Sequence, residues 1–145
     1  VLPYNSETWA LKESTKKKLR LFEMSCLRKI KGVTRRNRVR NTEIRRELKV
    51  ETDVVQIIQR RRLRYFGHIT RMSGERLPAI AFSGNVHGSR KRGRPKKRWE
   101  DNLKADLDEM GHTMVEAIRL ASSDRDVWRK SVLGLSERGS PSPRH

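Results

Sequence analysis

The positive charge of this chain is concentrated in its first two thirds, and this distribution limits what the chain can fold into. Lys and Arg number 35 against 17 Asp and Glu, which gives a formal net charge of +18. Residues 1–72 carry +13 and residues 73–98 carry +7, whereas residues 99–145 carry −2. With only 34% hydrophobic residues, such a chain can bury a modest core at most. The imbalance therefore favours a protein that binds a polyanion.

Length and cysteine content exclude other classes of protein. The 145 residues are enough for one domain of ordinary size. The longest uncharged stretch starts at Leu77 and is interrupted by Pro78 and Gly84, whereas a membrane span needs about 20 apolar residues. Cys26 is the single cysteine, so a disulfide framework and cysteine-based zinc modules are excluded. We therefore expect no membrane partner and no metal held by cysteines.

The spacing of apolar residues predicts an all-α fold, a small assembly of about five or six helices. The first helix is expected over residues 14–31, with a buried stripe that consists of Leu19, Phe22, Cys26 and Ile30. Asn41 is expected to cap a short second helix, and Asp53 a third helix whose end is weakened by Gly67. The buried residues of the third helix are expected to be Val54, Ile57, Ile58, Tyr65 and Ile69.

After residue 72 the pattern changes, because Gly and Pro interrupt any long element up to residue 98. Residues 80–86 are expected to form a short strand. A helix is expected to start at Trp99 and to stop at Gly111, with an apolar face that consists of Leu103, Leu107 and Met110. Two further helices are predicted by two capping boxes, Thr113 with Glu116 and Ser123 with Asp126.

These patterns divide the chain into four segments. They are a basic helical segment over residues 1–72, a basic loop over 73–98, a helical segment over 99–135 and a disordered tail over 136–145. Trp99 and Trp128 lie at helical spacing from other apolar residues of the third segment. We expect both indoles in the core rather than stacked on nucleic-acid bases.

The basic residues form three clusters, and arginine dominates the first two. A guanidinium can bind phosphate through two parallel hydrogen bonds, which a lysine ammonium cannot do. Each cluster alone could be a solvated helix face, but three of them without nearby acidic residues favour binding. We therefore predict that nucleic acid is bound by Arg35, Arg36, Arg38, Arg40, Arg60, Arg61, Arg62, Arg64, Arg90, Lys91, Arg92, Arg94, Lys96, Lys97 and Arg98.

The third cluster contains the sequence Arg92-Gly93-Arg94-Pro95, which matches the core of an AT-hook. An extended Arg-Gly-Arg segment fits the narrow minor groove of A·T-rich DNA, where the negative potential is deepest. Two other interpretations remain open at this point. The same residues are compatible with a flexible basic linker that contacts phosphates of any sequence, or with a nuclear-localisation signal.

The sequence does not contain an arrangement typical of catalysis. Cys26 lies on the expected apolar stripe, where a free cysteine behaves as a small hydrophobic residue. The four histidines lack a metal-binding spacing. Asp106 and Glu109 share a helix face, but we expect them to be solvated and to pair with Lys104. We therefore expect no catalytic residue, metal, cofactor or small-molecule substrate.

An ordered set of short motifs spans residues 4–132. Its members are Ser6-Glu7-Thr8-Trp9, Phe22-Glu23-Met24, Cys26-Leu27-Arg28-Lys29-Ile30, Arg61-Arg62-Leu63-Arg64-Tyr65-Phe66-Gly67-His68, Arg76-Leu77-Pro78, Gly93-Arg94-Pro95-Lys96-Lys97-Arg98-Trp99, Asp124-Arg125-Asp126 and Trp128-Arg129. Together they resemble the region after the polymerase core in non-LTR (LINE-type) retrotransposon reverse transcriptases of the RTE or jockey-like kind. The resemblance implies an α-helical thumb and post-polymerase segment that grips the template–primer duplex.

Relatives of that kind carry an endonuclease and a polymerase core with catalytic aspartates, and the matched region contains neither. The expectation is therefore a non-catalytic nucleic-acid-binding fragment of an RNA-directed DNA polymerase, which contacts RNA, DNA or a hybrid through phosphates. The alternative is a domesticated nuclear DNA-binding protein that uses the AT-hook-like loop. Either way, we expect a nuclear location, or a cytoplasmic ribonucleoprotein, and not a secreted protein.

Overall fold

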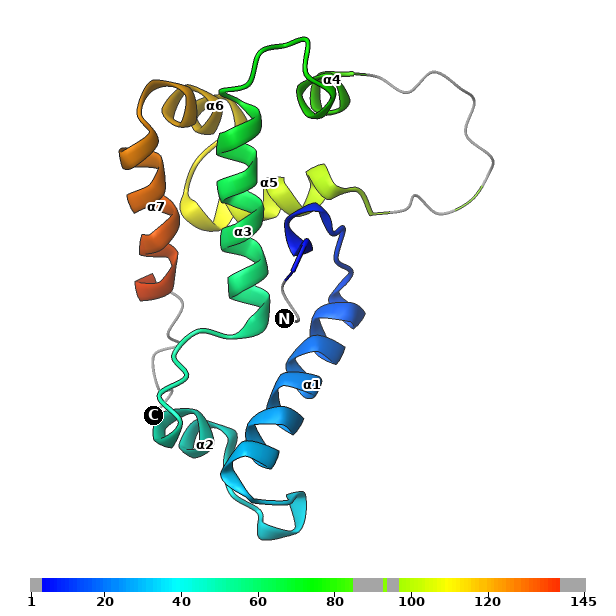
Figure 1. Ribbon diagram of the computed structural model, residues 1–145, viewed down its shortest axis with the longest axis vertical. Coiled ribbons are helices and arrows are strands. Elements are labelled where there is room, and N and C mark those ends of the chain that lie inside the picture. Colours follow the sequence, from blue (N-terminus) through cyan, green and yellow to red (C-terminus); the bar gives the residue numbers. More distant parts are fainter. Residues whose placement is uncertain (1–3, 85–92, 94–96, 139–145) are drawn as a thin grey trace.

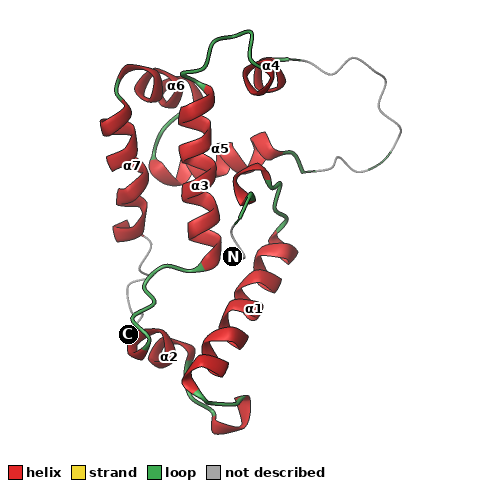
Figure 2. Cartoon of the chain, in the orientation of Figure 1, coloured by secondary structure: helices red, strands yellow, loops and turns green. Residues whose placement is uncertain are grey.

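The computed structural model describes residues 4–84, 93 and 97–138, with side chains up to residue 134. Every regular element within these residues is helical (Figure 2), so the predicted all-α fold is confirmed. In chain order the elements are two short 3-10 helices and seven α-helices: η1 (Ser6–Thr8), α1 (Glu13–Lys31), η2 (Arg35–Asn37), α2 (Asn41–Glu47), α3 (Val54–Ile69), α4 (Leu77–Ser83), α5 (Trp99–Met110), α6 (Met114–Ser123) and α7 (Arg125–Arg138).

Helix α3 lies at the centre of the structure (Figure 1), in contact with η1, α1, α4, α5, α6 and α7. Its buried apolar residues are Val54, Val55, Ile58, Leu63, Phe66 and Ile69. They occupy several faces, and a helix of this kind is stable only when other elements cover it. The predicted burial of Val54, Ile58 and Ile69 is confirmed, whereas Ile57 and Tyr65 are half-buried.

The main hydrophobic core lies between α3 and the three C-terminal helices. It consists of Leu63, Phe66, Leu103, Leu107, Met110, Ala117, Ala121, Trp128 and Val132. A second cluster joins Leu11 to the start of α3, and a third joins Ile44 of α2 to α1. The predicted segments 1–72 and 99–135 therefore share one core, because α3 of the first segment packs against helices of the second. The core includes the apolar face predicted for α5, Leu103, Leu107 and Met110.

Capping chemistry fixes several helix ends as predicted. The Asp53 carboxylate accepts the Gln56 backbone N–H at 2.8 Å, and the Gln56 side chain accepts the Asp53 N–H at 3.0 Å. Thr113 and Glu116 form the same reciprocal arrangement at the start of α6. Gly32 and Gly111 end α1 and α5 in the left-handed region, with φ of 73° and 78°.

The predicted apolar stripe of α1 is wrong at Phe22 and Ile30, whereas Leu19 and Cys26 are half-buried. Phe22 and Ile30 are 55% and 71% exposed, and the buried residues are Met24 and Leu27. The reason is that charged residues orient the helix as well. Glu23 of α1 pairs with Arg45 of α2, and Lys31 pairs with Glu47 at 2.6 Å. These ion pairs turn the face with Met24 and Leu27 toward α2.

Three predicted boundaries also differ. Asn41 is the first residue of α2 and not its cap, because Arg40 occupies the N-cap position. The predicted strand is wrong where the structure describes it, because Leu77–Ser83 is helical with Pro78 in its first turn. Helix α7 continues to Arg138, three residues into the expected tail, and residues 139–145 lie outside the described residues.

The predicted box of Ser123 with Asp126 is wrong as well, because Ser123 is still the last residue of α6. The Ser123 hydroxyl donates to the carbonyl oxygen of Leu120 at 3.2 Å. Asp124 serves the start of α7 instead. Its carboxylate accepts the backbone N–H groups of Asp126 at 2.7 Å and Val127 at 3.1 Å.

Gly67 allows α7 to approach α3 closely. A Cβ atom at this position would overlap with the Nε1 and Cδ1 atoms of the Trp128 indole. The Trp128 Nε1–H donates to the carbonyl oxygen of Leu63 at 3.1 Å, and its ring lies 5.7 Å from that of Phe66. Gly67 lowers the helix propensity of α3, but packing against Trp128 requires it.

We expect Gly67→Ala to lower the free energy of unfolding by about 1–3 kcal/mol, because the new methyl group must displace a buried indole. Gly134→Ala in α7 is the matched control, since a Cβ there meets no atom within 4 Å. The control should raise the free energy of unfolding by about 0.5–1 kcal/mol through helix propensity. Urea denaturation measures both variants, and a stabilising effect of Gly67→Ala would contradict the close approach.

Candidate nucleic-acid interface

The predicted cluster of arginines on α3 is divided between the interior and the surface. Arg62 is 1% exposed and forms an ion pair with Asp106 of α5. Its prediction as a phosphate-binding residue is therefore wrong, because α3 is central and its residue 62 faces α5. Arg61 and Arg64 are exposed, and Arg60 is half-buried.

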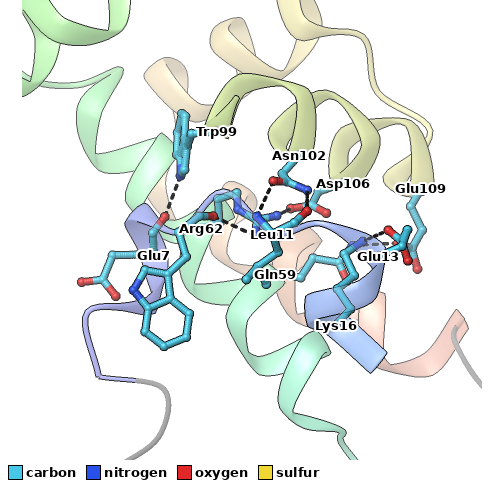
Figure 3. A network of polar contacts seen from close by, with 11 residues as sticks. Glu7, Leu11, Glu13, Lys16, Gln59, Arg62, Trp99, Asn102, Asp106 and Glu109 are labelled. Carbon is cyan, nitrogen blue, oxygen red and sulfur yellow. Dashed lines mark hydrogen bonds and ion pairs between the residues drawn. The ribbon is translucent and has the colours of Figure 1, made fainter. Parts of the chain in front are cut away.

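Arg62 belongs to a polar network that joins α3 and α5 to the N-terminal segment (Figure 3). The Asn102 side chain bonds to the backbone of Leu11 twice, as acceptor at 2.8 Å and as donor at 2.9 Å. The Trp99 Nε1–H donates to the carbonyl oxygen of Glu7 at 2.7 Å. Gln59 of α3 donates to the Glu109 carboxylate at 2.7 Å. Each of these bonds connects segments that are far apart in the sequence.

The expected environment of Asp106 is wrong. Asp106 is buried beside Arg62, and Lys104 pairs with Glu100 at 2.9 Å instead. Burial raises the pKa of the Asp106 carboxyl to about 6, and the neighbouring Arg62 lowers it without offsetting the lost hydration. The Nε of Arg62 has no hydrogen-bond partner among the described residues. The pair is thus a structural feature of the interior and not a nucleic-acid contact.

The first arginine cluster lines a groove between α1 and residues 35–41. This groove has a volume of about 570 Å³, and its lining includes Lys17, Arg20, Leu21, Met24, Arg28, Arg35, Arg38, Val39 and Asn41. Arg35 and Arg38 come from the predicted set, whereas Arg36 and Arg40 are exposed outside the groove. The spacing of residues 17, 21, 24 and 28 places them on one helix face, a signal that sequence analysis missed.

Some cations in this groove are already bound to other groups. Arg20 pairs with Asp53 at 2.9 Å, and Arg28 donates to the side-chain oxygen of Asn41. Among the described residues, neither an ion pair nor a side-chain hydrogen bond engages Lys17, Arg35 or Arg38. These three side chains are available to an anion.

A second basic groove, of about 620 Å³, lies between α3 and α7. It is lined by Arg64, His68, Arg71, Arg125, Trp128 and Arg129. Only Arg64 belongs to the predicted set. Arg125 and Arg129 were missed because the last third of the chain has a negative net charge, and His68 and Arg71 because they lie outside the runs of consecutive arginines. Basic residues four apart on each helix were a usable signal.

The third predicted cluster is mostly beyond what the structure describes. Arg90, Lys91, Arg92, Arg94 and Lys96 lie outside the described residues. Lys97 is half-buried, and Arg98 is exposed at the N-cap position of α5, where its backbone N–H donates to Asp101 at 2.7 Å. The AT-hook-like core therefore stays a sequence prediction.

The two tryptophans differ in their surroundings. Trp128 is 2% exposed, so its predicted place in the core is confirmed. Trp99 is half-buried, with its ring edge-on to those of Tyr65 and Phe82 at 6.3 and 6.1 Å. Beside it lies an apolar pocket of about 180 Å³. Packing and the bond to Glu7 account for the position of the Trp99 ring.

The described residues do not contain a group of three or more His, Cys, Asp or Glu that could hold a metal ion. None of the helices in this part of the chain combines the length and the apolar character that crossing a membrane requires. Comparison of the chain with protein-family models, curated proteins and solved structures finds no match.

The raised pKa of Asp106 predicts a pH dependence of stability with a defined sign. The folded state binds the proton more tightly than the unfolded chain, in which an Asp pKa is about 3.9. Protonation of Asp106 therefore stabilises the folded state. This contribution to the free energy of unfolding is fully present below about pH 4 and is lost as the pH rises through about 6. At 1.36 kcal/mol per pKa unit, the loss is about 3 kcal/mol.

Asp106→Asn, which does not titrate, provides the reference. Between pH 4 and pH 7, the free energy of unfolding of the wild type should fall by about 3 kcal/mol relative to that of the variant. Urea denaturation at several pH values measures this difference. A difference that is constant, or that grows with pH, would contradict the raised pKa.

Proposed function

We propose that the chain is a non-catalytic nucleic-acid-binding fragment of a retrotransposon reverse transcriptase, which grips template–primer through phosphate contacts. The observation that supports it most is the groove between α1 and residues 35–41. There Lys17, Arg35 and Arg38 gather on one surface without carboxylate partners among the described residues. Guanidinium groups held in this way match the geometry of phosphate oxygens.

The charge of the chain favours the same kind of partner. A net charge of +18 attracts a polyanion over a long range, and each phosphate contact releases counterions. Contacts to phosphates position a duplex without identifying its sequence. The groove offers arginine and lysine cations above an apolar floor of Leu21, Met24 and Val39. The proposed binding is therefore strong at low salt and depends little on base sequence.

The assignment to a retrotransposon rests on the motifs over residues 4–132 alone. It is tested by the reading frame that precedes Val1 in the source genome. A frame that continues into a polymerase core with paired aspartates supports the proposal. An initiator Met with its own promoter directly upstream supports the alternative, a domesticated DNA-binding protein that uses the loop with Arg92 and Arg94.

For the binding itself, we expect the logarithm of the association constant to fall with the logarithm of salt concentration, at a slope of about −5 if about six phosphates are contacted. Arg35→Gln/Arg38→Gln should reduce the magnitude of this slope by about two, since each phosphate that the variant no longer binds removes about 0.9. Fluorescence anisotropy with a labelled duplex at several NaCl concentrations measures both slopes.

The control Arg119→Gln/Lys130→Gln removes the same charge from exposed positions outside both basic grooves. It should leave the slope nearly unchanged. Duplexes rich in A·T and in G·C should bind alike, whereas a strong preference for A·T would favour the alternative function. A wild-type affinity that does not respond to salt would refute phosphate-based binding.

A further inference from the structure

The groove between α3 and α7 gathers four arginines and a histidine around one hollow. Arg64 and His68 lie one turn apart on α3, and Arg125 and Arg129 lie one turn apart on α7. Arg71 completes the lining at the end of α3. Two helices thus present basic side chains to one hollow, although α7 belongs to the acidic third of the chain.

The floor of this groove is fixed by buried contacts. Trp128 is held by its hydrogen bond to Leu63 and by its packing on Gly67. The Arg71 Nη1–H donates to the carbonyl oxygen of Ala121 at 2.6 Å, which ties the end of α3 to α6. This bond uses one of the five N–H donors of the Arg71 guanidinium. The floor and the Arg71 side chain are therefore in place before a ligand binds, which lowers the entropic cost of binding at these positions.

The positive charge of the groove is not neutralised by the described carboxylates. None of their ion pairs includes Arg64, Arg71, Arg125 or Arg129. Two acids adjoin Arg125 in sequence. Asp124 is engaged with backbone N–H groups of α7, and these bonds lower the pKa of its carboxyl. Asp126 takes part in none of the ion pairs among the described residues. Several cations that face one hollow repel one another, so an anion that enters the groove is attracted by all of them.

The shape and lining of the groove indicate which anion fits. Sites for small molecules are mostly lined by apolar and aromatic groups, whereas four of the six residues here are arginines. A volume of about 620 Å³ exceeds what one phosphate group needs, and the groove is open to solvent. A run of backbone phosphates, which can continue beyond both ends of the hollow, matches these properties.

We propose that the groove between α3 and α7 is an anchoring site for the sugar–phosphate backbone of nucleic acid. Arg64 and His68 hold the strand from one wall, and Arg125 and Arg129 hold it from the other. This inference rests on the proposed function and adds a site to it, separate from the groove between α1 and residues 35–41. It assigns a role to Arg125 and Arg129, where the net charge of the segment gives no indication of binding.

The test uses the full chain and a fluorescein-labelled duplex of 20 base pairs, with anisotropy titrations at several NaCl concentrations. Arg64→Gln/Arg129→Gln removes one cation from each wall of the groove. Arg119→Gln/Lys130→Gln, on the exposed surfaces of α6 and α7, removes the same charge elsewhere. Circular dichroism and thermal unfolding show whether each variant keeps the fold, and Arg125→Gln/His68→Gln serves as a second groove variant.

The groove variant should bind the duplex at least tenfold more weakly at 150 mM NaCl. Its salt slope should be smaller in magnitude by one to two, about one for each phosphate that it no longer binds. The control variant should weaken binding no more than threefold, with an unchanged slope. Equal losses of affinity in both groove variants and the control would overturn the anchoring site while the proposed function stands. A wild-type chain that does not bind the duplex would overturn both.

Discussion

The buried ion pair of Arg62 and Asp106 is the constraint on which the arrangement of the helices depends. It joins the middle of α3 to α5, two helices that are 44 residues apart at this contact. A buried pair of this kind contributes little net stability compared with apolar residues, but loss of one partner costs about 3–5 kcal/mol. Its main effect is therefore on specificity. An α3 that rotated about its axis would leave the Asp106 carboxylate buried without its partner.

The same pair determines which surfaces are basic. Because Arg62 faces inward, Arg61 and Arg64 face outward, and Arg64 lies on the side where α7 packs. Gly67, one turn farther along, brings Trp128 and α7 close enough for Arg64 to share a groove with Arg129. One helix thus supplies the centre of the core and one wall of a basic groove. The geometry of that groove depends on interior contacts rather than on the surface residues alone.

Sequence reasoning succeeded at several local determinants, although the caps predicted at Asn41 and Ser123 were each displaced by one residue. The cap at Asp53, the box of Thr113 with Glu116 and the glycine stop at Gly111 depend on residues within one helical turn, and all were correct. It failed where the partner is distant. The burial of Arg62 depends on Asp106, and the orientation of α1 depends on ion pairs with α2.

The basic grooves illustrate the same limit for function. Summing charge over segments identified the first two thirds of the chain as basic, and it identified Arg35, Arg38 and Arg64. It could not identify Arg125 and Arg129, because acidic neighbours cancel them in the sum. Among the described residues, no ion pair joins Arg125 or Arg129 to these neighbours, and the Asp124 carboxylate caps α7 instead. A ligand interacts with the local arrangement of charges, and this arrangement is set by tertiary structure.

The arrangement of charges in the grooves also couples stability to binding. Cations that share a groove without counter-charges repel one another in the folded state, and this repulsion is relieved when the chain unfolds and the charges separate. The grooves therefore lower the stability of a protein whose described residues form one main hydrophobic cluster and two small ones. An anion bound only by the folded state reverses the effect, by about 2.7 kcal/mol at a concentration of 100 times Kd. If nucleic acid is that anion, the residues that weaken the free protein are the ones through which its partner stabilises it.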